Sequence, residues 1–248
     1  MSSLSFPQNS NSPKHHYIFG YGSLINKESR QRTLQKSQDA IPVKISGFER
    51  SWSYRCNRKD YTAVSVSRQK NTQVNGVLVK LDNPEADLLQ LDAREIHYAR
   101  GLIDSSSVEF LGVSPPAAVD LQNALIWVYE NHDPAYENYN KNSQTIPIIA
   151  QKHAPCPNYP IPQSYVDCIL SGCLIYGVDF AQEFVRTTGG WTREAFLQDR
   201  TFHSNKKYQC RHDLGEKPIL FCPKMVDSLL SDVLFNVSIR RASSSSRL

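Results

Sequence analysis

Apolar and polar positions along the first half of the chain predict a set of β-strands. A short apolar run at 17–19 ends at a glycine-containing turn, and a second extended segment opens at 43–47. Between 61 and 81 the apolar side chains alternate twice, on either side of a polar stretch at 68–73, which predicts an antiparallel hairpin. The run at 124–129 is apolar throughout, which favours a strand in the middle of a sheet.

Two short helices are predicted between these strands. Asn26 is a suitable N-cap for a helix that reaches Leu34. Asn83 and Pro84 combine a capping side chain with a fixed backbone dihedral, and acidic side chains follow at the positive end of the helix dipole. This second helix delivers the chain into the polar sequence 92–95.

Helical periodicity dominates the last third of the chain. Apolar side chains fall on one face of a predicted helix over 164–177, and Ser164 with Asp167 resembles a capping box at its start. A second helix is expected over 179–187 because two glycines follow it, and Thr192 is a suitable cap for a third.

The pattern divides the chain into four expected segments. Residues 1–14 are polar and predict a disordered N-terminal tail, and the serine-rich residues 242–248 predict a flexible C-terminal tail. Residues 15–135 form the predicted β-rich domain. Residues 136–241 are expected to form a loop and a helical extension, including a helix near 225–235, packed on the same domain.

Composition narrows the class of protein. The chain has 248 residues, of which 28 are basic and 24 acidic, so the net charge is +4, and 40% of the residues are hydrophobic. This is enough apolar surface for one domain with an extension. The basic side chains are spread along the chain, so we expect no nucleic-acid partner. Because no apolar stretch approaches roughly 20 residues, we also expect no membrane partner.

The cysteines favour a reducing, cytoplasmic location. The six cysteines contain no Cys-x-x-Cys pair, and they are too sparse for a disulfide scaffold. The C-terminal Ser246-Arg247-Leu248 resembles a peroxisomal address, which makes the peroxisome the alternative location.

The turn after the first strand is the first candidate site. Gly20 and Gly22 allow consecutive backbone N–H groups to converge on an anion or a carbonyl oxygen. Ile25 occupies the position of the third glycine in a dinucleotide-binding fingerprint, and no Walker lysine follows, so the turn is not a nucleotide loop. A purely structural connection between strand and helix is the competing interpretation.

Glu95 is the second candidate. It lies in a polar cluster after the second helix, and a solvated helix end is the simplest interpretation of that cluster. A carboxylate surrounded by side chains such as Ile96 and Tyr98 would instead have a raised pKa and could both take and return a proton near neutral pH.

The order of these two features resembles the gamma-glutamylcyclotransferase-like superfamily. The resemblance covers roughly residues 15–130. It implies an α+β fold with a small mixed β-barrel and flanking helices. In this chain a helical C-terminal extension is expected after that domain. The motifs that carry it are Tyr21-Gly22-Ser23-Leu24 and, about seventy residues later, Leu91-Asp92-x-x-Glu95-x-x-Tyr98-x-Arg100.

The resemblance also implies a reaction. In the superfamily, the glutamate that matches Glu95 is the general acid/base, and the turn binds the glutamyl end of a small γ-glutamyl substrate. The α-amine of that substrate attacks its own γ-carbonyl, which releases 5-oxoproline and an amine or amino acid. No metal or organic cofactor is implied. With two tyrosines added from their positions in the sequence, the expected substrate-binding residues are Gly20, Tyr21, Gly22, Ser23, Leu24, Tyr98 and Tyr129.

Several of these residues have alternatives. Leu24 is a departure, because many relatives have asparagine there, and members differ in whether they prefer glutathione, γ-glutamyl amino acids or γ-glutamyl amines. Tyr98 and Tyr129 are candidates for pocket walls, with Trp127 beside the latter, although ordinary core packing competes.

Arg50 and Arg55 are softer candidates. Their guanidinium groups would attract the carboxylates of a substrate. A solvated strand edge is the simpler explanation of both residues.

Two other functions compete with the enzyme. One is a non-catalytic binding or regulatory protein that keeps the fold and the pocket. The other is a metal-dependent hydrolase, since His203, Cys210, His212 and Cys222 are zinc-ligand types. Their spacing matches no finger or ribbon, so we expect no metal site.

Overall fold

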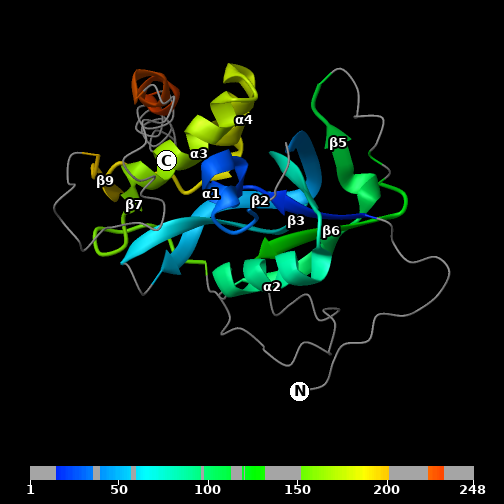
Figure 1. Cartoon of the computed structure of the whole chain (residues 1–248). Helices are drawn as coiled ribbons and strands as arrows, with labels where there is room; N and C mark the ends of the chain where they lie inside the picture. Colours follow the sequence, from blue (N-terminus) through cyan, green and yellow to red (C-terminus); the bar gives the residue numbers. More distant parts are fainter. Residues whose placement is uncertain are drawn as a thin grey trace.

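A mixed β-sheet forms the centre of the protein (Figure 1). The computed structural model describes residues 15–35, 40–56, 60–95, 98–112, 119, 121–131, 152–200 and 223–231. Within them the strand order is β4-β6-β1-β3-β2-β5, with β8 beside β2. The strands are β1 (His15–Gly20), β2 (Ile41–Cys56), β3 (Tyr61–Leu81), β4 (Ala99–Ile103), β5 (Val108–Phe110), β6 (Ala124–Glu130) and β8 (Thr188–Gly189).

The sheet curls into a half-barrel, which confirms the expected α+β class and the mixed barrel. β1 runs parallel to β6 and antiparallel to β3, so both strand orientations meet at β1. Strands β4 and β5 end the path among the described residues, so the barrel is open there. β6 lies between β4 and β1, as its wholly apolar sequence predicts.

The predicted hairpin at 61–81 is wrong in its pairing. These residues form one long strand, β3, and both of its halves pair with β2 rather than with each other. The pairing passes from Ser46 opposite Gln73 to Phe48 opposite Arg68. Four residues of β3 therefore face Gly47 alone, and this glycine has a φ of 84° that suits such a bulge. The polar stretch at 68–73 is therefore a bulge within one continuous strand, and not the turn of a hairpin.

The two early helices start as predicted. In α1 (Lys27–Gln31) the Asn26 side chain accepts a hydrogen bond from the Ser29 N–H. In α2 (Pro84–Arg94) the Asn83 side chain accepts one from the Ala86 N–H. Between β1 and α1 lies a single 3-10 turn, η1 (Ser23–Ile25). α1 ends earlier than expected.

The later helices are α3 (Gln163–Leu174) and α4 (Val178–Thr187). The predicted capping box at the start of α3 does not form. Asp199 instead accepts hydrogen bonds from the Ser164 N–H and hydroxyl, at 2.7 and 2.5 Å, while Asp167 pairs with Arg200. The predicted third helix after Thr192 is also wrong. The chain there turns into β9 (Phe196–Leu197), which pairs with β7 (Ile161–Pro162), and residues 223–231 are helical.

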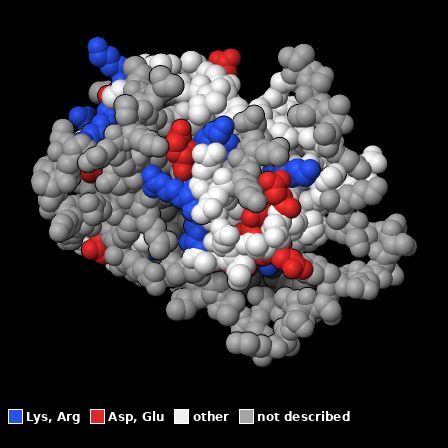
Figure 2. Space-filling view, viewed as in Figure 1, with Lys and Arg blue, Asp and Glu red and all other residues white. Residues whose placement is uncertain are grey.

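The helices cover both sides of the sheet. In Figure 1, α2 lies below the sheet, and α1, α3 and α4 lie above it. Side chains of α3 and α4 such as Ile169 and Phe184 belong to the same buried cluster as Val66 and Val79 of β3. No described helix is long and apolar enough to cross a membrane. On the face in Figure 2, the described basic and acidic side chains are interspersed.

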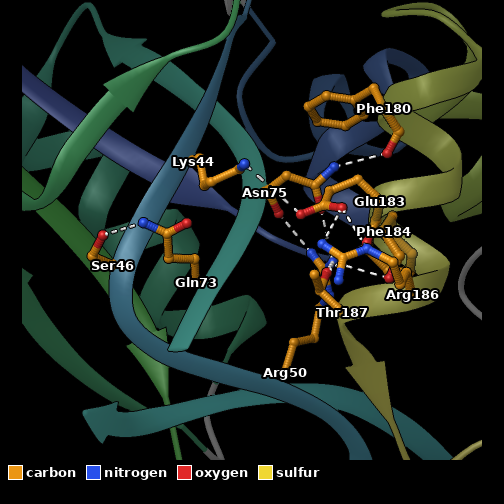
Figure 3. Close-up of polar contacts among 10 residues, drawn as sticks. All are labelled: Lys44, Ser46, Arg50, Gln73, Asn75, Phe180, Glu183, Phe184, Arg186 and Thr187. Atoms are coloured by element: carbon orange, nitrogen blue, oxygen red, sulfur yellow. Dashed lines mark hydrogen bonds and ion pairs between the residues drawn. The ribbon is translucent and has the colours of Figure 1, made fainter. Parts of the chain in front are cut away.

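A buried arginine joins α4 to the sheet (Figure 3). Arg50 is 1% exposed, and its guanidinium donates to the Asn75 carbonyl and side-chain oxygens at 2.6 and 2.9 Å. It also donates to the Phe184 carbonyl and to the hydroxyls of Thr187 and Thr188. Burial lowers the pKa of Arg50 to about 9, which still leaves it protonated at neutral pH. Arg50 is therefore neither a substrate anchor nor a solvated edge residue.

Some expectations concern residues outside the described ranges. These are both predicted tails, Ile96, most of the loop after residue 131, the candidate zinc-ligand types between 203 and 222, and the C-terminal targeting sequence. In the described ranges, no cluster of three or more His, Cys, Asp or Glu side chains could hold a metal ion.

Candidate active site

A small cavity lies where β1 ends and the chain turns into η1. Its volume is about 40 Å³. The end of β1, the turn, β3, the end of α2, β6 and α3 all contribute to its wall. The lining residues are Phe19, Tyr21, Gly22, Ser23, Leu24, Val64, Glu95, Tyr98, Tyr129 and Tyr165.

The structure brings together nearly all of the predicted site residues. Seven of the eight line the cavity, although they come from segments up to about a hundred residues apart. Gly20 does not line it but lies beneath the turn, where a Cβ would stand 2.8 Å from the Leu24 Cβ. Trp127 also lies outside the lining, and its indole N–H donates to His16 Nδ1 at 3.4 Å.

The two glycines of the turn allow close packing. A Cβ on Gly22 would stand 2.9 Å from Val64 Cγ1 and 3.7 Å from the Tyr165 hydroxyl. A side chain at this position would therefore enter the cavity. The turn itself is held by a hydrogen bond of 2.9 Å from the Ile25 N–H to the Gly22 carbonyl.

The hydroxyl protons of three lining tyrosines are engaged in hydrogen bonds within the wall. Tyr21 donates to the Tyr129 carbonyl at 2.6 Å, Tyr98 to the Val64 carbonyl at 3.2 Å, and Tyr129 to Asp92 Oδ1 at 2.6 Å. Burial raises the pKa of all three phenols, so they are neutral. With their protons engaged, these hydroxyls have no donor left for a ligand. The Tyr21 oxygen already accepts a hydrogen bond from the Val66 backbone, so the oxygens of Tyr98 and Tyr129 are the acceptors left for a ligand.

Glu95 adds the titratable carboxylate. Its side chain is 19% exposed, and Oε1 lies 3.1 Å from Arg94 Nε. Burial raises the pKa of Glu95, and Arg94 partly opposes this shift because its charge favours the ionised carboxylate. Among the described residues of the lining, Glu95 and Tyr98 are partly exposed and the others are buried, so the mouth of the cavity lies beside these two residues.

Sequence reasoning missed three residues at this site. Tyr165 lines the cavity from α3, and only its place on the apolar face of that helix indicated a role. Asp92 accepts from Tyr129 and pairs with Arg100 Nη1 at 3.0 Å. Arg94 contacts Glu95 but, as its immediate neighbour in a polar run, carried no separate signal in the sequence.

Arg55 lies in different surroundings from those expected. Its guanidinium carbon stands 4.9 Å from the centre of the Tyr159 ring, and Nη2 lies 3.8 Å from Cys156 Sγ. It is not among the residues that line the cavity.

The chain resembles several solved proteins at low sequence identity. No match was found among the curated proteins. A solved gamma-glutamyl cyclotransferase is 11% identical, with 69% of this chain and 86% of that one covered and a TM-score of 0.47. YkqA from Bacillus subtilis is 20% identical, with 71% and 55% covered and a TM-score of 0.45. A yeast gamma-glutamyl cyclotransferase specific to glutathione is 12% identical, with 70% and 90% covered and a TM-score of 0.36.

The comparison with protein families gives the assignment. The family described as gamma-glutamyl cyclotransferase, AIG2-like, matches residues 18–151. The match spans more than half of the chain and includes the turn, Glu95 and Tyr129, which meet at the cavity. The chain therefore belongs to the gamma-glutamyl cyclotransferase, AIG2-like family.

Proposed function

We propose that the protein is a γ-glutamyl cyclotransferase that releases 5-oxoproline and an amine or amino acid. The observation that carries the proposal is the meeting of Glu95 with the turn 21–24 in one cavity, where the hydroxyl oxygens of Tyr98 and Tyr129 are left as hydrogen-bond acceptors. The acceptors suit an amine, and the glycine-containing turn suits a carbonyl oxygen or a carboxylate.

The mouth of the cavity gives the direction of binding. The glutamyl end enters past Glu95 and Tyr98 toward the turn, and the leaving group stays at the mouth. There it meets the ring of Tyr98, which packs against Tyr54 with centroids 4.8 Å apart. A volume of about 40 Å³ holds roughly three water molecules, so a glutamyl group displaces these and moves the partly exposed wall.

The proposed reaction needs one proton transfer in each direction. Glu95, as the carboxylate, takes a proton from the α-amine as its nitrogen attacks the γ-carbonyl carbon. The carbonyl oxygen becomes an oxyanion, which the backbone N–H groups of the turn stabilise. The bond from the γ-carbon to the leaving nitrogen then breaks, and Glu95 returns its proton to that nitrogen. The ring closure is intramolecular, so correct folding of the substrate supplies much of the acceleration. This chemistry uses no metal or organic cofactor.

The test is a panel of substrates with the purified protein. Glutathione, γ-glutamyl amino acids and γ-glutamyl amines are supplied separately, and 5-oxoproline is measured by mass spectrometry. We expect release from at least one class and its loss, by about 10²-fold or more, in Glu95→Gln. Glu28→Gln, which changes an exposed carboxylate of α1, is the matched control and keeps full activity.

Either of two outcomes contradicts the proposal. One is a folded protein that releases no 5-oxoproline from any class, and the other is undiminished turnover in Glu95→Gln. Binding of a γ-glutamyl compound without product would favour a non-catalytic binding protein.

A further inference from the structure

Arg94 connects the two halves of the candidate active site. It is the last residue of α2, and its Nη2 donates to the Ser23 hydroxyl at 2.8 Å, within the turn. Its Nε lies 3.1 Å from Glu95 Oε1. One guanidinium therefore touches both the turn and the carboxylate.

The same guanidinium is anchored on α1. Nη1 donates to the Ser29 carbonyl and to the Thr33 hydroxyl, each at 3.1 Å, and Nη2 lies 3.3 Å from the Ser29 hydroxyl. The planar fork of arginine presents five donors in fixed directions, which a lysine ammonium cannot reproduce. The position of Arg94 is thus determined by α1 as well as by the site.

The conformation at the end of α2 allows Arg94 to contact the side chain of Glu95, its neighbour in the chain. Neighbouring side chains in a helix point in different directions, but Glu95 is the C-cap, with φ −102° and ψ 36°. Leaving the helical conformation at this residue allows its carboxylate to turn back to the guanidinium of Arg94.

We propose that Arg94 is a positioning residue that holds Glu95 and the substrate-binding turn in one arrangement and keeps the Glu95 carboxylate ionised. This inference rests on the proposed cyclotransferase function, because it assigns Glu95 the role of proton acceptor. Arg94 acts through Glu95 and Ser23 and does not itself line the cavity.

Among the described residues, the other groups that interact with Glu95 carry no positive charge. Tyr21, Tyr98 and Tyr129 interact with Glu95 and are neutral, and Tyr165 lines the same wall. Two further carboxylates that interact with these tyrosines are paired with other arginines, Asp92 with Arg100 and Glu130 with Arg68. Within the described part of the chain, the cation paired with Glu95 is therefore Arg94.

The test compares Arg94→Met, Arg94→Lys and Arg186→Met. An opposite charge in contact lowers a carboxyl pKa by roughly 1–3 units, so Arg94→Met moves the acid limb of kcat/KM up by about one pH unit or more. Arg94→Lys keeps the charge but loses the fork to Ser23, so the limb stays closer to wild type while KM rises. Arg186, an exposed partner of Glu183, is the matched control, and its replacement leaves the profile unchanged.

A direct titration separates this inference from the proposed function. The carboxyl carbon of Glu95 is followed by ¹³C NMR in glutamate-labelled protein and assigned by its loss in Glu95→Gln. The expected result is a higher Glu95 pKa in Arg94→Met than in wild type. If wild type releases no 5-oxoproline, the proposed function fails, but the titration still tests the contact.

The inference is overturned if folded Arg94→Met shows the wild-type Glu95 titration and the wild-type acid limb. If Arg94→Met does not fold, Arg94→Lys decides the question by the KM effect. A wild-type KM in Arg94→Lys then contradicts the positioning role.

Discussion

Replacement of Arg50 by methionine tests whether the buried arginine network stabilises the fold. The change keeps an unbranched apolar stem beside the Phe184 ring, whose centre lies 3.7 Å from the guanidinium carbon. It removes every donor to Asn75, Phe184, Thr187 and Thr188. The two threonine hydroxyls keep their own bonds to helix carbonyls, so the carbonyl and side-chain oxygens of Asn75 are the acceptors most affected.

The magnitude follows from two opposing effects. A buried acceptor that loses its donor costs roughly 1–3 kcal/mol, and bonds from a charged donor are worth about 1.5–3 kcal/mol each. The substitution also removes a buried charge, so the folded protein no longer bears the free-energy cost of desolvating a guanidinium. This recovers part of the lost stability. We therefore expect a loss of about 3 kcal/mol in the free energy of unfolding, or a fall in Tm of roughly 6–12 °C for a chain of this size.

Urea unfolding followed by tryptophan fluorescence measures the change. Trp52 and Trp191 are buried with ring centroids 5.1 Å apart, so their emission reports on the interior of the sheet and its contact with α4. Arg186→Met again serves as the control, since exposed ion pairs contribute about 0–1 kcal/mol. A loss below about 1 kcal/mol in Arg50→Met would refute the stabilising role.

Three further predictions concern the site and one helix. Gly22→Ala places a methyl group 2.9 Å from Cγ1 of the buried Val64, so 5-oxoproline release falls by about 10²-fold, and the crowding also lowers Tm, measured by circular dichroism. Asp199→Ala removes the cap of α3 and lowers the urea-unfolding free energy by about 1 kcal/mol, whereas Asp199→Asn keeps most of it. The raised pKa of Glu95 places the acid limb of kcat/KM above pH 4.5. Activity rises with pH through this limb because the ionised carboxylate is the base. An acid limb below pH 4.5 would contradict the assignment of Glu95 as the base.

The local features of the fold were predictable from the sequence. Asn26 and Asn83 begin helices because a capping side chain acts on the next turn of the chain, within three residues. The wholly apolar 124–129 run lies between two strands for the same local reason, that both of its faces must be buried.

Features that depend on distant partners were not predictable. The start of α3 is capped by Asp199, which is 35 residues away, so the nearby Asp167 was the wrong choice. The two halves of β3 alternate like a hairpin, and only the length of β2 and its bulge at Gly47 decide that both pair with the same neighbour. Burial of Arg50 depends on acceptors from α4, which no pattern around residue 50 indicates.

The candidate site shows the same division. The turn and Glu95 were candidates from their local sequence, and their order along the chain then supported a family resemblance; the structure places them in one cavity. Arg94, which contacts Glu95 and Ser23, and Asp92, which accepts a hydrogen bond from Tyr129, act through hydrogen bonds and ion pairs whose partners are set by folding. Such contacts leave no periodic signal in the sequence.

The central claim is that the α-amine of the substrate, rather than water, attacks the γ-carbonyl. A γ-glutamyl substrate identified from the panel is turned over in water enriched with ¹⁸O, and the products are analysed by mass spectrometry. We expect 5-oxoproline without ¹⁸O in an amount equal to the released amine or amino acid, and about 10²-fold less of both products, or lower still, from Glu95→Gln. Glutamate carrying ¹⁸O would show hydrolysis instead and would contradict the account.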